Sequence, residues 1–104
     1  MTIQFNTDNT ISGTETVTAP FTAQISDALS RFSSHITRIE VHLGDENGHK
    51  AGINDIRCMM EARMEGKQPI AVTNHAGTTG QAVSGAIDKL KASLDTIIGR
   101  DRKY

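Results

Sequence analysis

Four histidines and one cysteine are the side chains of this sequence best suited to hold a metal ion. The histidines are His35, His42, His49 and His75, and no two have the compact spacing of a zinc motif. Cys58 belongs to an alternating pattern that places it on the buried side of a strand. A single cysteine also cannot form an internal disulfide. We therefore predict no metal site and interpret Cys58 as a core residue.

Serine, histidine and carboxylate side chains also occur, but the sequence does not arrange them for catalysis. The glycines are scattered, without the spacing of a phosphate-binding loop. No serine has the strand–turn–helix context of a nucleophile elbow, and no two carboxylates are paired in an apolar setting. We predict no catalytic residue, no cofactor and a protein that is not an enzyme.

Basic residues near the C-terminus are the strongest candidates for a binding function. A predicted final helix and the tail behind it carry Lys89, Lys91, Arg100, Arg102 and Lys103. Such cations can neutralise the phosphates of a nucleic acid. They also suit an ordinary solvated helix, because Lys91 is three residues from Asp88 and four from Asp95 and can pair with either. The residues alone leave both interpretations open.

Three arginines elsewhere extend this candidate set. Arg31 projects from the first predicted helix, and Arg38 and Arg63 lie on the polar sides of two predicted strands. On those strands, Glu40 and Glu61 are close enough to form cross-strand charge pairs that keep an open sheet face soluble. The alternative is that the two strand arginines contact phosphates or bases.

The chain has 104 residues, which predicts one domain, residues 1–104, with one hydrophobic core. Its net charge of −1 excludes a strongly polycationic coat but leaves room for a local basic cluster. No apolar run approaches membrane-spanning length, and the N-terminus lacks the features of a signal peptide. We expect a cytoplasmic protein that makes no use of a membrane.

Hydrophobic periodicity predicts a short strand over residues 2–6, followed after a loop by a helix. Thr18 is the expected N-cap of this helix, with Pro20 in its first turn. The helix should run to the end of an apolar stripe consisting of Val17, Phe21, Ile25, Ala28, Leu29, Phe32 and Ile36. Alternating residues then predict strands over 37–43, 56–64 and 70–73, with a hairpin turn at residues 65–68.

The final helix should be capped by Thr78 or Thr79 and stopped by Gly99. Its predicted apolar stripe is Ala82, Val83, Ala86, Ile87, Leu90, Leu94 and Ile97. The element order is βαβββα, and the first crossover makes the first two strands parallel. We predict an α+β fold in which a four-stranded mixed sheet carries both helices on one face.

Several fragments resemble the ribosome hibernation-promoting factor family, also called ribosome-associated inhibitor A or the sigma-54 modulation protein family. The fragments span nearly the whole chain and are Ile3-Gln4-Phe5, residues 28–32, residues 36–43, Asn54-Asp55 and Ala86-Ile87-Asp88-Lys89-Leu90. Their order and spacing carry the resemblance more than any one of them. Since the chain ends soon after the final helix, it resembles the short form of the family.

This resemblance implies a double-stranded-RNA-binding-domain-like fold. It also implies a protein that binds the decoding region of the small ribosomal subunit and silences translation under stress or in stationary phase, with rRNA as partner. The final helix carries fewer cations here than the family usually shows, with Ser93, Thr96 and Gly99 in the stretch concerned. The alternative is a diverged protein-interaction module or weak homodimer that uses the open sheet face or an exposed strand edge.

Overall fold

The computed structural model describes residues 1–7, 15–45 and 55–102, with the backbone alone for residues 15–17 and 100–102. The elements are β1 (Thr2–Thr7), α1 (Glu15–Ala28), a short 3-10 helix η1 (Ser30–Phe32), β2 (Ile36–Asp45), β3 (Ile56–Met64), β4 (Ile70–Ala76) and α2 (Thr79–Arg102). The predicted βαβββα order is confirmed. The loops predicted around residues 8–13 and 46–54 lie outside the described residues.

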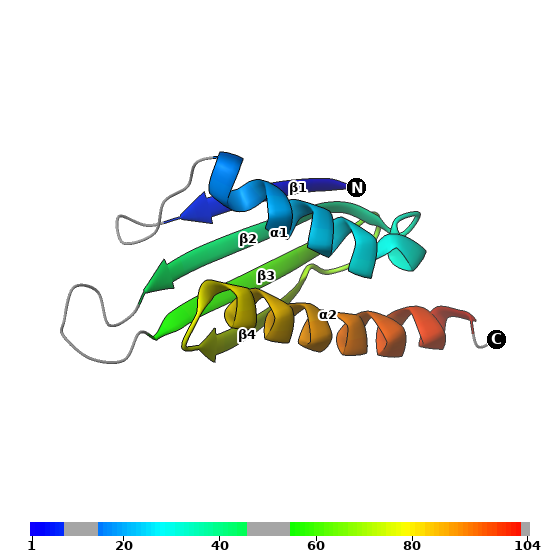
Figure 1. The fold of residues 1–104 in the computed structure, drawn as a ribbon. Coiled ribbons are helices and arrows are strands. Elements are labelled where there is room, and N and C mark those ends of the chain that lie inside the picture. The colour runs from blue at the N-terminus through cyan, green and yellow to red at the C-terminus, as the bar shows by residue number, and fades with distance from the viewer. Residues whose placement is uncertain (8–14, 46–54, 103–104) are drawn as a thin grey trace.

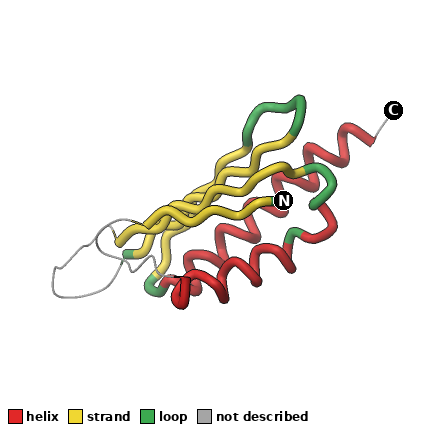
Figure 2. The backbone as a smooth tube through the Cα atoms, turned by 90° about the horizontal axis from the view of Figure 1, so that it is seen from above, coloured by secondary structure: helices red, strands yellow, loops and turns green. Residues whose placement is uncertain are grey.

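The four strands form one sheet in the order β1-β2-β3-β4. Strands β1 and β2 are parallel, and the two following pairs are antiparallel, as the crossover and the hairpin patterns predict. Gly66 adopts a φ of 75° in the turn between β3 and β4, a conformation that a glycine reaches without steric cost. Figures 1 and 2 show α1 and α2 side by side on one face of the sheet, so the other face is left open.

The core lies between the sheet and the two helices. Alternate residues of β2 and β3 point into it, and the completely buried ones include Ile39, Val41, Cys58, Met60 and Ala62. The opposing helices, with the turn after α1, contribute Ile25, Leu29, Ala82, Val83, Ala86, Leu90 and Leu94, all with no exposed surface. The predicted alternation of both strands and most of both helical stripes are therefore confirmed.

Helix α2 is fixed on β4 by polar contacts at its first turns. The Thr78 hydroxyl accepts a hydrogen bond from the backbone N–H of Gln81 at 3.1 Å, which makes Thr78 the N-cap. The Asn74 side chain donates to the carbonyl oxygens of Gln81 at 3.4 Å and Ala82 at 3.2 Å. Polar contacts thus set the position of the helix on the sheet, in addition to the apolar stripe.

The predicted start of the first helix is wrong. Helix α1 begins at Glu15, so Thr18 and Pro20 lie inside it. Thr18 is buried, and its carbonyl oxygen accepts a hydrogen bond from the Thr22 hydroxyl at 3.2 Å. Pro20 is the sixth of the 14 residues of α1, and its missing N–H leaves the helix one backbone hydrogen bond short at that point.

The predicted end of that helix is also wrong. Helix α1 stops at Ala28, where the hydrogen bonds change to the tighter i to i−3 pattern: Phe32 N–H to Leu29 O at 2.9 Å and His35 N–H to Phe32 O at 2.8 Å. Phe32 and Ile36 nevertheless remain buried, because the tight turn and the first residue of β2 direct them into the same core. The apolar spacing correctly identified these buried residues, but they belong to several elements and not to one helix.

The last helix continues past the predicted stop. Helix α2 runs through Gly99 to Arg102, since a glycine with helical φ weakens a helix without ending it. At the end of the stripe Ile98 is buried and Ile97 is only half-buried, which follows the four-residue step from Leu90 and Leu94. Within the described part of the chain, no helix is long and apolar enough to cross a membrane.

Candidate nucleic-acid interface

Two polar contacts join the helices across the outer surface of the domain. Gln24 of α1 donates to the Ser84 hydroxyl of α2 at 3.5 Å. Arg31 of η1 donates through Nη2 to Asp95 Oδ2 of α2 at 2.8 Å, although the two residues are 64 positions apart. We call the surface between Gln24, Arg31, Ser84 and Asp95 the interhelical groove.

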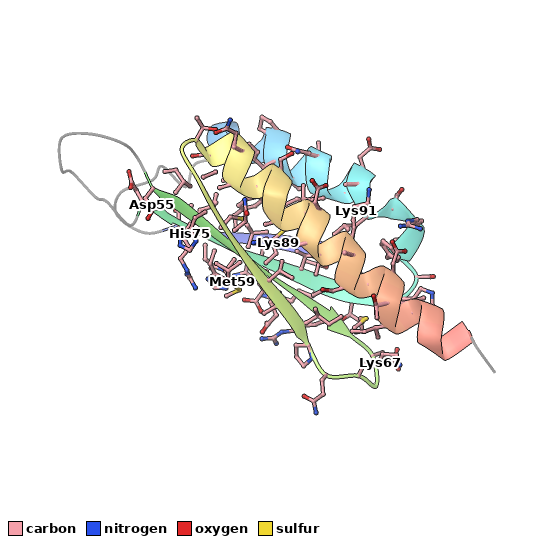
Figure 3. All side chains as sticks on the ribbon, turned by 90° about the horizontal axis from the view of Figure 1, so that it is seen from below. Asp55, Met59, Lys67, His75, Lys89 and Lys91 are labelled. Carbon is pink, nitrogen blue, oxygen red and sulfur yellow. The ribbon has the colours of Figure 1, made fainter. Side chains whose placement is uncertain are left out.

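Lys91 lies in this groove. It follows Ser84 by seven residues and precedes Asp95 by four, so the three share one flank of α2. Figure 3 shows Lys91 on the side of α2 that faces α1, and its side chain is half-buried. Among the residues that the structure describes, Lys91 has no ion-pair partner, because the carboxylate of Asp95 is bound to Arg31 instead. Neither of the predicted Lys91 pairs, with Asp88 or with Asp95, forms.

Arg31 is held in place by a second contact. Its guanidinium carbon lies 4.4 Å from the centre of the Phe32 ring, a cation–π geometry. The Phe32 side chain is itself buried in the core, so this ring is a fixed platform for the arginine. The Arg31 side chain is 58% exposed and that of Asp95 is 51% exposed, so both charges remain accessible to a ligand in solvent.

Lys89 does not share the groove with Lys91. Two residues of helix correspond to a rotation of about 200°, and Figure 3 shows the two lysines on different sides of α2. Lys89 Nζ donates a hydrogen bond to the carbonyl oxygen of Thr73 on the edge strand β4, at 2.7 Å. The structure therefore assigns Lys89 a contact with the sheet edge, which blunts the edge and occupies one of the three ammonium donors.

Arg38 and Arg63 lie on the open face of the sheet, on the side away from the helices. Arg63 pairs with Glu40 at 3.2 Å and with Glu61 at 2.9 Å, and Arg38 Nε lies 3.5 Å from the same Glu40 carboxylate. Arg38 also hydrogen-bonds to the Gln4 amide oxygen of β1. The two arginines and two glutamates form a charge-balanced network.

The strand register explains why this network forms. Arg38 stands opposite Arg63, and Glu40 stands opposite Glu61, so like charges face each other directly across β2 and β3. The diagonal pair of Arg63 with Glu40, together with one same-strand pair on each strand, offsets these repulsions. The hydrogen bond with Glu61 and the nearby Glu40 carboxylate raise the pKa of Arg63 above its ordinary value. This geometry favours charge pairing with the two glutamates over phosphate contacts for both arginines.

The remaining predicted residues stand at the end of α2. Arg100 and Arg102 belong to its last turn, but their side chains lie outside the described residues, as does Lys103. The predicted set therefore divides into Arg31 and Lys91 in the groove, Lys89 on the sheet edge, Arg38 and Arg63 on the open face, and the helix end. Sequence spacing did not reveal Asp95 as the partner of Arg31, because local pairing with Lys91 offered a simpler explanation.

Among the residues that the structure describes, Cys58 and the histidines are not arranged as a metal site. Burial raises the pKa of the Cys58 thiol to about 12, which disfavours the thiolate that binds metals. In residues 1–7, 15–45 and 55–102, no three His, Cys, Asp or Glu side chains are grouped as metal ligands. His49 lies outside that part of the chain.

Comparison with solved structures identifies the architecture. The N-terminal domain of Protein Y from Thermus thermophilus matches with a TM-score of 0.71 and 17% identity, over 93% of this chain and 99% of that one. A ribosomal subunit interface protein from Coxiella burnetii matches with a TM-score of 0.72 and 13% identity, over 95% and 99%. The chain has the fold of these two proteins. The predicted resemblance is thereby confirmed for the fold.

Unlike the comparison of structures, the comparisons of sequence found no match. No protein-family model matches the chain, and no curated protein matches it either. The fold is thus shared with these two structures at 17% and 13% sequence identity.

Proposed function

We propose that this chain is a ribosome-associated protein that binds the decoding region of the small subunit and silences translation under stress or in stationary phase. The observation that carries the proposal is the match, over nearly the full length of both chains, to a protein that is itself a ribosomal subunit interface protein. The resemblance of the ordered sequence fragments to the hibernation-promoting factor family supports the same conclusion independently of the coordinates.

The mechanism is steric occupancy. The helical face would lie against rRNA, and its cations would contact backbone phosphates without reading base edges. The contacts are assigned to Arg31, Lys91, Lys89, Arg100, Arg102 and Lys103, with Arg38 and Arg63 in support from the strands. A protein acting in this way needs no catalytic residue and no cofactor, and its place of action is the cytoplasm.

The charge of the helical face predicts modest affinity. Each cation that contacts a phosphate adds about one unit to the slope of log affinity against log salt. Among the described side chains of α1, η1 and α2, Arg31, Lys89 and Lys91 are balanced by Asp27, Asp88 and Asp95. We therefore expect binding at low salt that weakens rapidly as salt increases.

Co-sedimentation with purified ribosomal subunits tests the proposal. The chain should pellet with small subunits at low salt, should do so less with large subunits, and should inhibit translation in a purified system at the same concentrations. Absence from the small-subunit pellet even at low salt would show that the proposal is wrong. Sedimentation profiles of whole ribosomes would then show whether ribosome dimers form.

A protein-interaction module or homodimer is the second candidate. Strand β1 is an edge of the sheet, and its six residues include no charge and no proline, the two features that usually blunt an edge. On the open face, half-buried Met59 adds an apolar contact between His42 and Thr73 of the neighbouring strands. A dimer in light scattering that is insensitive to salt, together with no affinity for RNA, would favour this function.

A further inference from the structure

We propose that Arg31 and Lys91 form a binding site for a single RNA backbone phosphate in the interhelical groove, and that the Asp95 carboxylate occupies this site in the free protein. The inference rests on the proposed RNA binding and adds a residue that opposes it. Asp95 is thus a residue that sets affinity, in a surface where all other assigned residues are cations.

The Arg31–Asp95 contact has the geometry that a phosphate would use. A guanidinium binds a carboxylate and a phosphate through the same planar donors, and the separation of 2.8 Å is that of a charge-assisted hydrogen bond. Because the Phe32 ring lies beneath the guanidinium, Arg31 is already oriented before a ligand arrives. A phosphate oxygen can therefore replace Asp95 Oδ2 without moving Arg31 out of position.

Lys91 supplies the second charge. It lies one helical turn before Asp95 on the same flank, half-buried and without an ion-pair partner in the described part of the chain. Two cations and one carboxylate leave this part of the groove with a net charge of +1. An arriving phosphate would be attracted by the unpaired charge of Lys91 and would compete with Asp95 for Arg31.

The competition predicts a measurable loss of affinity. Opening an exposed ion pair corresponds to roughly a 1.4- to 5-fold change in an equilibrium constant. Asp95→Asn removes the competing charge but keeps the size of the side chain. This variant should bind small ribosomal subunits roughly 1.4- to 5-fold more tightly, and its salt slope should steepen by about one unit because Arg31 becomes available.

Asp88→Asn is the matched control. Asp88 is an exposed carboxylate on the same helix, and it has no partner among the described residues. Its removal changes the net charge by the same amount without freeing an arginine, so it should raise affinity less and leave the slope nearly unchanged. In the double variant Arg31→Gln/Asp95→Asn, the extra gain should disappear. Circular dichroism verifies folding, and Asp95→Gln serves as a second variant.

Both small subunits and an isolated RNA duplex serve as probes, so that the two proposals fail differently. If the wild-type chain binds small subunits but Asp95→Asn matches Asp88→Asn, the phosphate site is refuted and the ribosomal function stands. A gain that persists without Arg31 also refutes the site. If small subunits are not bound while Asp95→Asn alone binds the duplex more tightly, the site stands and the ribosomal function fails.

Discussion

Asn74 of β4 lies directly under Gly85 of α2, so close that a Cβ built on the glycine would be 2.1 Å from Asn74 Nδ2. We predict that Gly85→Ala destabilises the domain by about 1–2 kcal/mol. The alanine would displace the Asn74 amide from the Gln81 and Ala82 carbonyls, which outweighs the gain in helix propensity. Urea denaturation measures the change.

The neighbouring glycine provides the control for this prediction. A Cβ on Gly80 would meet nothing within 4 Å, so Gly80→Ala should stabilise the domain by up to about 1 kcal/mol. In an Asn74→Ala background, Gly85→Ala should likewise become stabilising. If Gly85→Ala costs the same with and without Asn74, the close approach is not the cause.

The two lysines of α2 should contribute unequally to RNA binding. Lys91→Gln should lower affinity for small subunits and reduce the salt slope by about one unit, because this ammonium has no partner to leave. Lys89→Gln should have a smaller effect on binding, because its ammonium already donates to Thr73 O. Filter binding over a salt series measures both. Equal losses would place Lys89 in the interface alongside Lys91.

The charge network of the open sheet face should stabilise the fold. Glu40→Gln leaves Arg38 and Arg63 opposite each other without their shared carboxylate, and should lower the free energy of unfolding by about 1 kcal/mol. High salt should reduce the difference. Glu65→Gln, in the exposed hairpin, is the control and should change stability by less than about 0.5 kcal/mol. A variant that keeps its stability but gains RNA affinity, as freed arginines would provide, would return these arginines to the interface.

Stability should fall in alkaline solution because of Cys58. Burial raises the pKa of this thiol from 9.0 to about 12, so between these values the folded state retains a proton that the unfolded state loses. This contribution is fully present below pH 9.0 and is lost above it, by up to about 1.4 kcal/mol per pH unit. Urea titrations above pH 9 on the wild type and Cys58→Ala check it. The difference in stability between the two proteins should shrink as pH rises, since lysine and tyrosine titrate in both.

Sequence periodicity predicted the fold because burial imposes it residue by residue. The alternation from Ile56 to Met64 identified every inward side chain of β3, and the order of elements followed. The ends of the helices were harder to predict, because the apolar spacing continues where the backbone hydrogen-bond pattern changes. Leu29, Phe32 and Ile36 have helical spacing, but they belong to a turn, a 3-10 helix and a strand.

The candidate site was less predictable because it depends on which residues the fold brings together. Arg31 and Asp95 are 64 positions apart, and no local sequence pattern predicts their contact. Lys89 and Lys91 look equivalent in the sequence, yet the helix turns one toward the sheet edge and the other toward α1. Charge alone could not separate them, because the distinction lies in the direction of each side chain.

The backbone of helix α2 continues past its last described buried side chain. Among the side chains that the structure describes, Ile98 is the last one of this helix that is buried, and nothing lies within 4 Å of a Cβ placed on Gly99. The backbone is helical through Arg102, so α2 extends about one turn beyond Ile98. A substitution at Gly99, where an added Cβ meets nothing, can therefore alter this end of the helix without disturbing the packing of the core.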